Sequence, residues 1–299
     1  MAKYFFILLT CLLLPWHSFA RVNIFACEPE WKSLADTIGG DHVTTSSATT
    51  AFEDSHHVKA KPSLMSRVGR ADLIICTGGE LEVGWLPLLL DKAKASVQPG
   101  NPGYLMASDY VTRLDIPTRL DRSQGDIHPG GNPHIHLNPH NIEAVAIELS
   151  RRLETIDPAS ASFYQQQLKD FLTRWHTQVR IWETKAKPLT QMPIVTGHNH
   201  WAYLTAWLGL KEVAMLEPKP GLPPTASHLE TVLQSVGKTP AKAILRAPFE
   251  DKAPSQWLSQ RSHIPVVTLA YTVGGSKDVT NLEQLFDRTI SQLLEQHDQ

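Results

Sequence analysis

The segment 158–186, PASASFYQQQLKDFLTRWHTQVRIWETKA, has no glycine and no proline after Pro158. Apolar side chains recur along it at helical spacing: Phe163, Leu168, Leu172, Trp175, Val179 and Trp182. This pattern predicts a single helix more than twice as long as the average helix of a globular protein. Its central position predicts a rigid connection, 158–187, between an N-terminal lobe at 21–157 and a C-terminal lobe at 188–299.

Short apolar runs alternate with amphipathic segments on both sides of this helix. In the first half we expect strands at 22–27, 42–45 and 71–76, and helices at 30–38, from Pro62 and at 81–93. In the second half we expect strands at 192–196, 212–215, 243–245 and 266–269, and helices at 200–208, 225–235, 254–262 and 282–295. The alternation predicts an α/β fold of two lobes, each a parallel sheet flanked by helices. We find a repeat of architecture but no repeat of sequence.

The N-terminus has the pattern of an export signal. Lys3 precedes the apolar run Tyr4–Leu14, and Ser18 and Ala20 are small residues at the −3 and −1 positions of a cleavage site before Arg21. The run is shorter than the roughly 20 residues that a membrane-spanning helix needs. We therefore expect residues 1–20 to be a cleaved signal peptide and the protein to be periplasmic. With 28 Lys and Arg against 30 Asp and Glu, no basic field for nucleic acid is present.

Two cysteines remain after Cys11 leaves with the signal peptide. Cys27 and Cys76 each end a strand-like run. If the two strands are neighbours in a parallel sheet, the Cα atoms fall within the roughly 4.4–6.8 Å that a disulfide requires. An oxidising compartment favours the bond. The alternative is a pair of buried free thiols.

Histidines gather where strands are expected to give way to helices. The chain has 14 histidines, and most of them lie in three clusters: 54–63 (DSHHVKAKPS), 125–140 (GDIHPGGNPHIHLNPH) and 196–201 (TGHNHW). Open α/β sheets bind ligands at such points. Three neutral imidazoles provide most of a tetrahedral Zn²⁺ site, whereas Mg²⁺ and Ca²⁺ prefer oxygen ligands.

Four motifs in order carry a family resemblance. They are 54–63 with 70–74 (RADLI) and 79–87 (GELEVGWLP), then 125–139, then 197–203 (GHNHWAY), then 217–221 (EPKPG). Together they resemble the periplasmic solute-binding proteins of zinc and manganese ABC importers, the cluster A-I family. The resemblance extends over essentially the whole mature chain.

The resemblance implies a site and leaves one position open. It implies that His56, His134 and His198 are the metal ligands, and that the doublet partners His57, His136 and His200 are not. Glu217 falls where the family has a carboxylate near the site, able to hydrogen-bond a ligand imidazole. Tyr271 occupies the place of the aspartate that relatives often use as fourth ligand. Water, Glu217 or Asp278 are the candidates for that position, in this order.

The resemblance implies transport. We expect a monomeric, high-affinity zinc-binding protein that captures the ion between its lobes and delivers it to the permease of an ABC importer, with Mn²⁺ as a less favoured ion. No catalytic residues are expected. The alternatives are a zinc-dependent hydrolase, in which three histidines and Glu217 would activate water, and an adhesin or metallochaperone on the same fold. No His-Glu-x-x-His motif supports a hydrolase.

Overall fold

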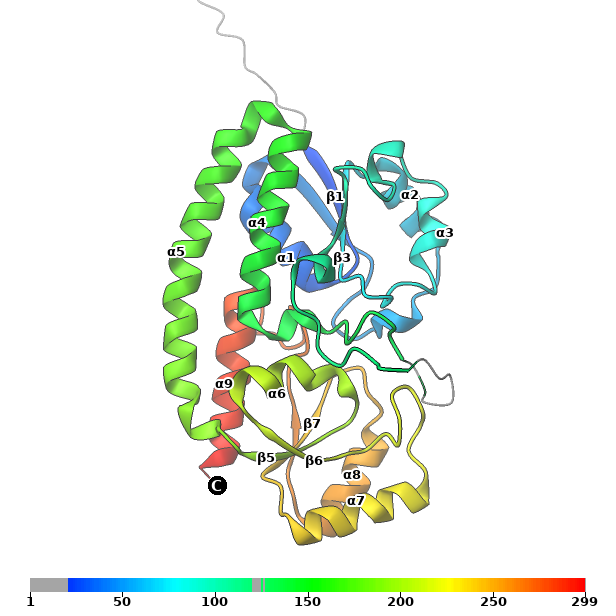
Figure 1. Ribbon diagram of the computed structural model, residues 1–299, viewed down its shortest axis with the longest axis vertical. Helices are drawn as coiled ribbons and strands as arrows, with labels where there is room; N and C mark the ends of the chain where they lie inside the picture. Colours follow the sequence, from blue (N-terminus) through cyan, green and yellow to red (C-terminus); the bar gives the residue numbers. More distant parts are fainter. Residues whose placement is uncertain (1–20, 120–124, 126, 299) are drawn as a thin grey trace, which may run out of the picture.

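The computed structural model describes residues 21–119, 125 and 127–298, and the predicted signal peptide lies outside them. Two four-stranded parallel sheets are flanked by helices and stacked along the long axis of the molecule, and a long helix runs beside both (Figure 1). The predicted two-lobed α/β fold is confirmed. Among the described residues, none of the helices has the length and apolar character that a membrane span requires.

The first sheet has the strand order β2-β1-β3-β4, with all neighbours parallel. Its strands are β1 (Val22–Ala26), β2 (Val43–Ser47), β3 (Leu73–Cys76) and β4 (Tyr104–Met106). Every residue of β3 is buried, as expected for a central strand with both faces covered. No strand is expected from the sequence at β4, because a three-residue strand shows too little alternation to be recognised.

The helices of the first lobe are α1 (Pro29–Gly39), α2 (Pro62–Arg70), α3 (Leu86–Leu90) and α4 (Pro139–Ile156). The predicted helix at 81–93 is wrong outside α3. Glu80 has a φ of 70°, in the left-handed region that ends rather than begins a helix. The Glu82 carboxylate also accepts a hydrogen bond from the Gly78 N–H, which stabilises a turn at this point.

The second sheet repeats the topology of the first, with the order β6-β5-β7-β8. Its strands are β5 (Pro193–Thr196), β6 (Lys211–Met215), β7 (Ala243–Arg246) and β8 (Val266–Thr268). Its helices are α6 (Ala202–Leu208), α7 (Ala226–Lys238) and α8 (Lys252–Ser262). The repeat of architecture expected from the sequence is therefore present.

The connecting helix is α5 (Ala161–Ala186), preceded by a 3-10 turn at Pro158–Ser160. It packs against α4, α1 and the C-terminal helix α9 (Leu282–His297), so it forms a wall shared by both lobes and not an isolated spacer (Figure 1). The rings of Trp182 and Phe286 lie 5.1 Å apart. One hydrophobic core continues from Trp31 through Trp175 to Leu245, which limits independent motion of the lobes. The lobe boundaries at 157 and 187 stay a prediction.

A disulfide joins Cys27 to Cys76 at the ends of β1 and β3. The two Cα atoms are 4.7 Å apart, within the range that a disulfide allows. The predicted bond is confirmed, and the alternative of free thiols is wrong. Closing a loop of 49 residues stabilises the folded state by about 4 kcal/mol in the chain-entropy model.

Candidate metal centre

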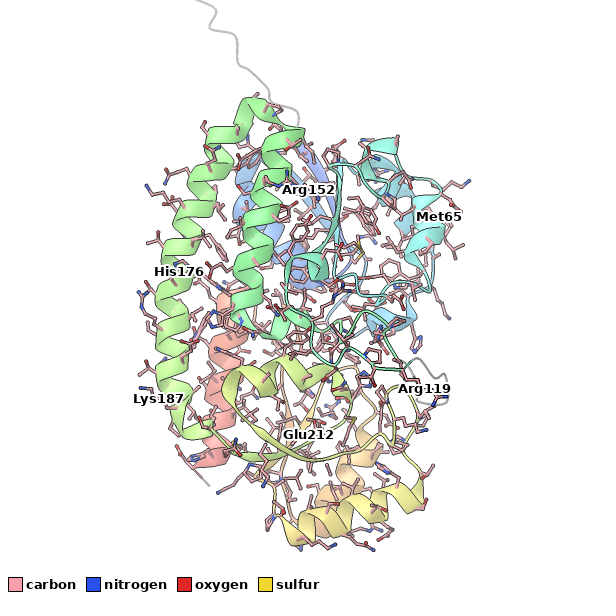
Figure 2. The ribbon with its side chains drawn as sticks, viewed as in Figure 1. Met65, Arg119, Arg152, His176, Lys187 and Glu212 are labelled. Atoms are coloured by element: carbon pink, nitrogen blue, oxygen red, sulfur yellow. A yellow bond between two sulfur atoms is a disulfide. The ribbon has the colours of Figure 1, made fainter. Side chains whose placement is uncertain are left out.

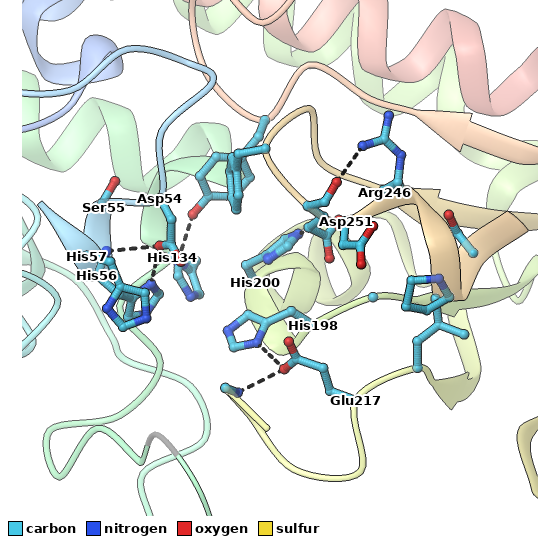
Figure 3. Close-up of a pocket in the computed structure, with 18 of the residues that line it drawn as sticks. Asp54, Ser55, His56, His57, His134, His198, His200, Glu217, Arg246 and Asp251 are labelled. Carbon is cyan, nitrogen blue, oxygen red and sulfur yellow. Dashed lines mark hydrogen bonds and ion pairs between the residues drawn. The ribbon is translucent and has the colours of Figure 1, made fainter. Parts of the chain in front are cut away.

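Three histidines from distant parts of the chain meet between the lobes (Figure 3). Their ligand-capable nitrogen atoms all lie within 4.8 Å of one another: His56, His134 and His198. The ring centroids of His56 and His134 are 5.3 Å apart, and those of His134 and His198 are 5.7 Å apart. These are the three residues that the family resemblance implies as ligands.

The parallel strands bring these histidines together. His56 lies in a 3-10 turn, Ser55–His57, beyond the carboxyl end of β2, and His198 follows the end of β5 with only Gly197 between. Gly197 leaves room beside it for the Glu250 carboxylate, which a Cβ atom at this position would force to move. His134 enters from the loop before α4. The first lobe thus contributes two of the three imidazoles and the second lobe one.

Each of the three imidazoles is oriented through its Nδ1 atom. The Nδ1 of His56 lies 2.8 Å from Asp54 Oδ1, that of His198 lies 2.7 Å from Glu217 Oε2, and that of His134 lies 2.6 Å from Tyr271 Oη. A carboxylate only accepts hydrogen bonds, so Nδ1 of His56 and of His198 carries the proton. Nε2 is then the free ligand atom on each ring, as in metal sites whose ligands are held by outer hydrogen bonds.

The electrostatics of the centre favour a bound cation. Burial, together with the neighbouring imidazoles of His56 and His198, holds the pKa of His134 well below its ordinary value, so this ring is neutral. Burial opposes ionisation of Asp54, yet its hydrogen bond with His56 outweighs this and lowers the pKa to about 2. Burial likewise opposes protonation of His198, but the hydrogen bond with Glu217 raises its pKa. The carboxylates of Asp54 and Glu217 therefore hold the rings of His56 and His198 through Nδ1, while the ring of His134 is neutral.

Tyr271, which stands in place of the expected aspartate, and Asp278, a candidate for the fourth ligand, both make other contacts. Tyr271 is 7% exposed, and burial and the charge of Glu30 raise the pKa of its hydroxyl well above 10, so it stays protonated. Asp278 has a side chain that is 60% exposed and bonds to Ser276 and Arg288. The structure does not bring Asp278 to the three histidines, whereas Glu217 contacts the centre through His198 Nδ1.

Sequence reasoning gave no role to two residues that contact the centre. Asp54 accepts both the backbone N–H and the ring hydrogen bond of His56. His128 places Nε2 at 3.3 Å from Nε2 of His56. The signal for both was present, since each stands inside a histidine motif, but no local pattern tells which way a loop side chain points.

The remaining histidines lie around or outside the centre. His136 and His200 are buried; Nε2 of His136 lies 3.0 Å from the Tyr271 carbonyl oxygen, and the rings of His200 and Tyr271 are 5.0 Å apart. His57 is exposed. His176 lies on α5, at the left edge of the view in Figure 2, and pairs with Glu143.

The centre opens into a cavity of about 270 Å³ on the side of Tyr271. All three histidines line it, together with apolar side chains such as Leu216 and Phe249. Four acidic residues also line the cavity: Asp54, Glu217, Glu250 and Asp251. All of them except Glu250 are labelled in Figure 3. This arrangement can hold a divalent cation that prefers nitrogen ligands.

Comparison with known proteins agrees with this geometry. The profile of the ZnuA family, described as zinc-uptake complex component A, periplasmic, matches residues 24–296. The manganese ABC transporter substrate-binding lipoprotein PsaA of Streptococcus pneumoniae is 24% identical over 257 residues, which cover 84% of this chain and 80% of PsaA. The PsaA protein of Streptococcus anginosus is 24% identical over 259 residues, covering 84% of this chain and 80% of that protein.

Solved structures show the same fold. A crystal structure of ZnuA superposes with a TM-score of 0.77 at 18% identity, covering 92% of this chain and 99% of the other. The manganese-bound periplasmic metal-binding protein of Candidatus Liberibacter asiaticus gives a TM-score of 0.75 at 16% identity, covering 93% of this chain and all of that one. Since the family profile spans nearly the whole chain, the protein belongs to the ZnuA family of substrate-binding proteins of metal ABC transporters.

Proposed function

We propose that this protein binds Zn²⁺ in the periplasm through His56, His134 and His198 and delivers the ion to the permease of an ABC importer. Family membership makes it a substrate-binding protein of a metal transporter. The proposal adds the ion, the ligands and the compartment. The observation that carries it is that three imidazoles have their Nδ1 atoms occupied and their ligand atoms within 4.8 Å of one another.

The donor set favours Zn²⁺ over Mn²⁺. Zinc accepts four-coordinate sites rich in imidazole, whereas Mn²⁺ favours carboxylate, carbonyl and water oxygens and binds more weakly in the general order of divalent metals. Tyr271 replaces a carboxylate with a hydroxyl whose pKa is raised by burial and by Glu30. The relatives named for manganese show that the fold also serves that ion, so the ligand atoms of this chain must decide the preference.

Binding and release follow from the placement of the ligands. An ion held jointly by His56 and His134 from one lobe and His198 from the other ties the lobes together at the pocket. The relative position of the two lobes at the pocket then differs between the metal-bound and the metal-free protein. A permease can select one of these two states. Since the lobes share one core behind the pocket, we expect a small tilt and not a wide opening.

The hydrolase alternative has less support. It needs a carboxylate free to take a proton from water, and Glu217 already accepts hydrogen bonds from His198 Nδ1 and from the Gly221 N–H. Glu217 is therefore a group that orients a ligand.

The test combines metal analysis with three substitutions. Protein purified from the periplasm should contain zinc when its metal content is measured, and zinc should displace Mn²⁺ in competition. Replacing His56, His134 or His198 by Ala should weaken zinc binding roughly tenfold or more, because each change removes a bond to the ion. His176→Ala and His263→Ala are the controls, since these residues lie outside the pocket. Unchanged affinity in any of the three variants would remove that histidine from the site.

A further inference from the structure

His128 and His56 face each other through their Nε2 atoms, which are 3.3 Å apart. In a tetrahedral zinc site with bonds of 2.0–2.1 Å, two ligand nitrogens are about 3.3–3.4 Å apart. The separation of 3.3 Å between the two Nε2 atoms therefore suits two ligands of one ion.

His128 also shares a cavity with the other two ligands. A second hollow of about 360 Å³ is lined by His128, His134 and His198, and by neither His56 nor Tyr271. The cavity on the Tyr271 side is lined by the three ligand histidines but not by His128. His134 and His198 thus line both cavities, and His128 lines the cavity that Tyr271 does not.

A tight turn holds His128 in this position. The carbonyl oxygen of His128 accepts a hydrogen bond of 2.9 Å from the Gly131 N–H, and Pro129 stands at the second position, where its fixed φ suits such a turn. Gly131 has a φ of 96°, and a Cβ atom there would lie 2.6 Å from the Leu114 carbonyl oxygen, so the turn is built for glycine.

We propose that His128 supplies the fourth ligand, so that four imidazoles hold the ion. This inference rests on the proposed function, since it completes the same site. Of the candidates expected from the sequence, Glu217 is bonded to His198 Nδ1 and Asp278 is exposed, so water is the remaining alternative to His128. His128 thereby completes a set of four ligands from a different loop and from a different cavity than the one that Tyr271 lines.

A histidine instead of an aspartate as fourth ligand changes the chemistry of the site. An aspartate contributes a negative charge and a hard oxygen, whereas an imidazole contributes a neutral nitrogen. The charge of the ion is then balanced outside the ligand sphere by Asp54 and Glu217, which bond the ligand rings. An all-nitrogen set disfavours Mn²⁺ further.

X-ray absorption at the zinc edge tests the proposal, because scattering from imidazole rings counts the histidine ligands. The purified protein with one equivalent of zinc should give four imidazoles. His128→Ala should give three imidazoles and one oxygen from water, with zinc affinity lower by roughly tenfold or more. The control is His140→Ala, an exposed histidine nearby in sequence that pairs with Glu183, and it should retain four.

Two results would overturn the assignment: three imidazoles with an oxygen in the unmodified protein, or four imidazoles in His128→Ala. Circular dichroism and the melting temperature without metal show that each variant is folded. His134→Ala separates this inference from the proposed function. If His134→Ala weakens zinc binding while His128→Ala binds zinc with unchanged affinity, only the fourth ligand is wrong. If neither variant weakens zinc binding, the site itself is wrong.

Discussion

The hydroxyl oxygen of Tyr271 lies 2.6 Å from Nδ1 of His134, across 137 positions of sequence. The tyrosine therefore supports a ligand of the proposed site through the ring nitrogen that is not proposed to bind the ion. Hydrogen bonds of this kind fix the tautomer and orientation of a ligand imidazole.

Tyr271→Phe should weaken zinc binding by about 10-fold to 100-fold, the range found when a partner of a metal-bound histidine is removed. The ring remains, so packing against His136 and His200 is preserved and the apo-protein should melt close to the unmodified protein. Isothermal titration with zinc gives the affinity. An unchanged affinity would mean that packing alone orients His134.

Zinc should stabilise the fold without being needed to form it. An ion that binds only the folded state adds about 4 kcal/mol at a thousandfold excess over Kd. For a chain of this size that corresponds to a rise in Tm of roughly 8–16 °C. A chelator should reverse the rise and leave the far-ultraviolet circular dichroism at 25 °C intact, because one continuous core supports both lobes. Loss of native dichroism on chelation would make the metal structural.

Zinc should outcompete Mn²⁺ by well over a hundredfold, or roughly 3 kcal/mol. The physical reason is that the family resemblance implies an aspartate where Tyr271 stands, and tyrosine offers neither the hard carboxylate oxygen nor its negative charge. Tyr271→Asp should narrow the gap in a competition titration of the two ions. Comparable affinities in the unmodified protein would show that a carboxylate completes the shell.

A buried pair of glutamates should make stability depend on pH. Burial, with repulsion from Glu82, raises the pKa of Glu28, and burial raises the pKa of Glu82 to about 7. A raised carboxyl pKa means that the folded state holds the proton more tightly than the unfolded state. The contribution is thus present in full below about pH 4.3 and is lost as pH rises through about 7.

Glu82→Gln should reduce this dependence, because it removes one of the two titrating carboxyl groups and its repulsion of Glu28. The amide can still accept the hydrogen bond from the Gly78 N–H, and it can donate to Glu28, one of whose carboxylate oxygens is buried without a partner. The variant should gain stability relative to the unmodified protein between pH 5 and pH 8, as measured by urea unfolding.

The control is Glu148→Gln: burial opposes ionisation of Glu148, but hydrogen bonds from Arg151 and Arg152 lower its pKa to about 2. Its effect should be constant over this range. Equal pH slopes for the two variants would contradict the assignment.

Local sequence was sufficient for the elements that repeat a simple period. The absence of glycine and proline in 161–186, with apolar residues at helical spacing, determined α5. Buried parallel strands such as β3 and β5 appear as continuous apolar runs, and their order alternates with helices in both lobes. Two predictions failed for local reasons. Strand β4 was missed because it is too short to show a period, and the helix predicted at 81–93 is wrong outside α3 because Glu80 adopts a left-handed conformation.

For the site, too, the sequence was sufficient for some features and only the tertiary structure decided others. The family resemblance of three motifs in the sequence implied His56, His134 and His198 as ligands. Only the tertiary structure decided that Tyr271 bonds His134 and that His128 faces His56, over separations of 137 and 72 residues. These contacts join loops of different lobes or of different motifs. Their geometry is set by how the two sheets pack around the shared core, and no local propensity encodes that.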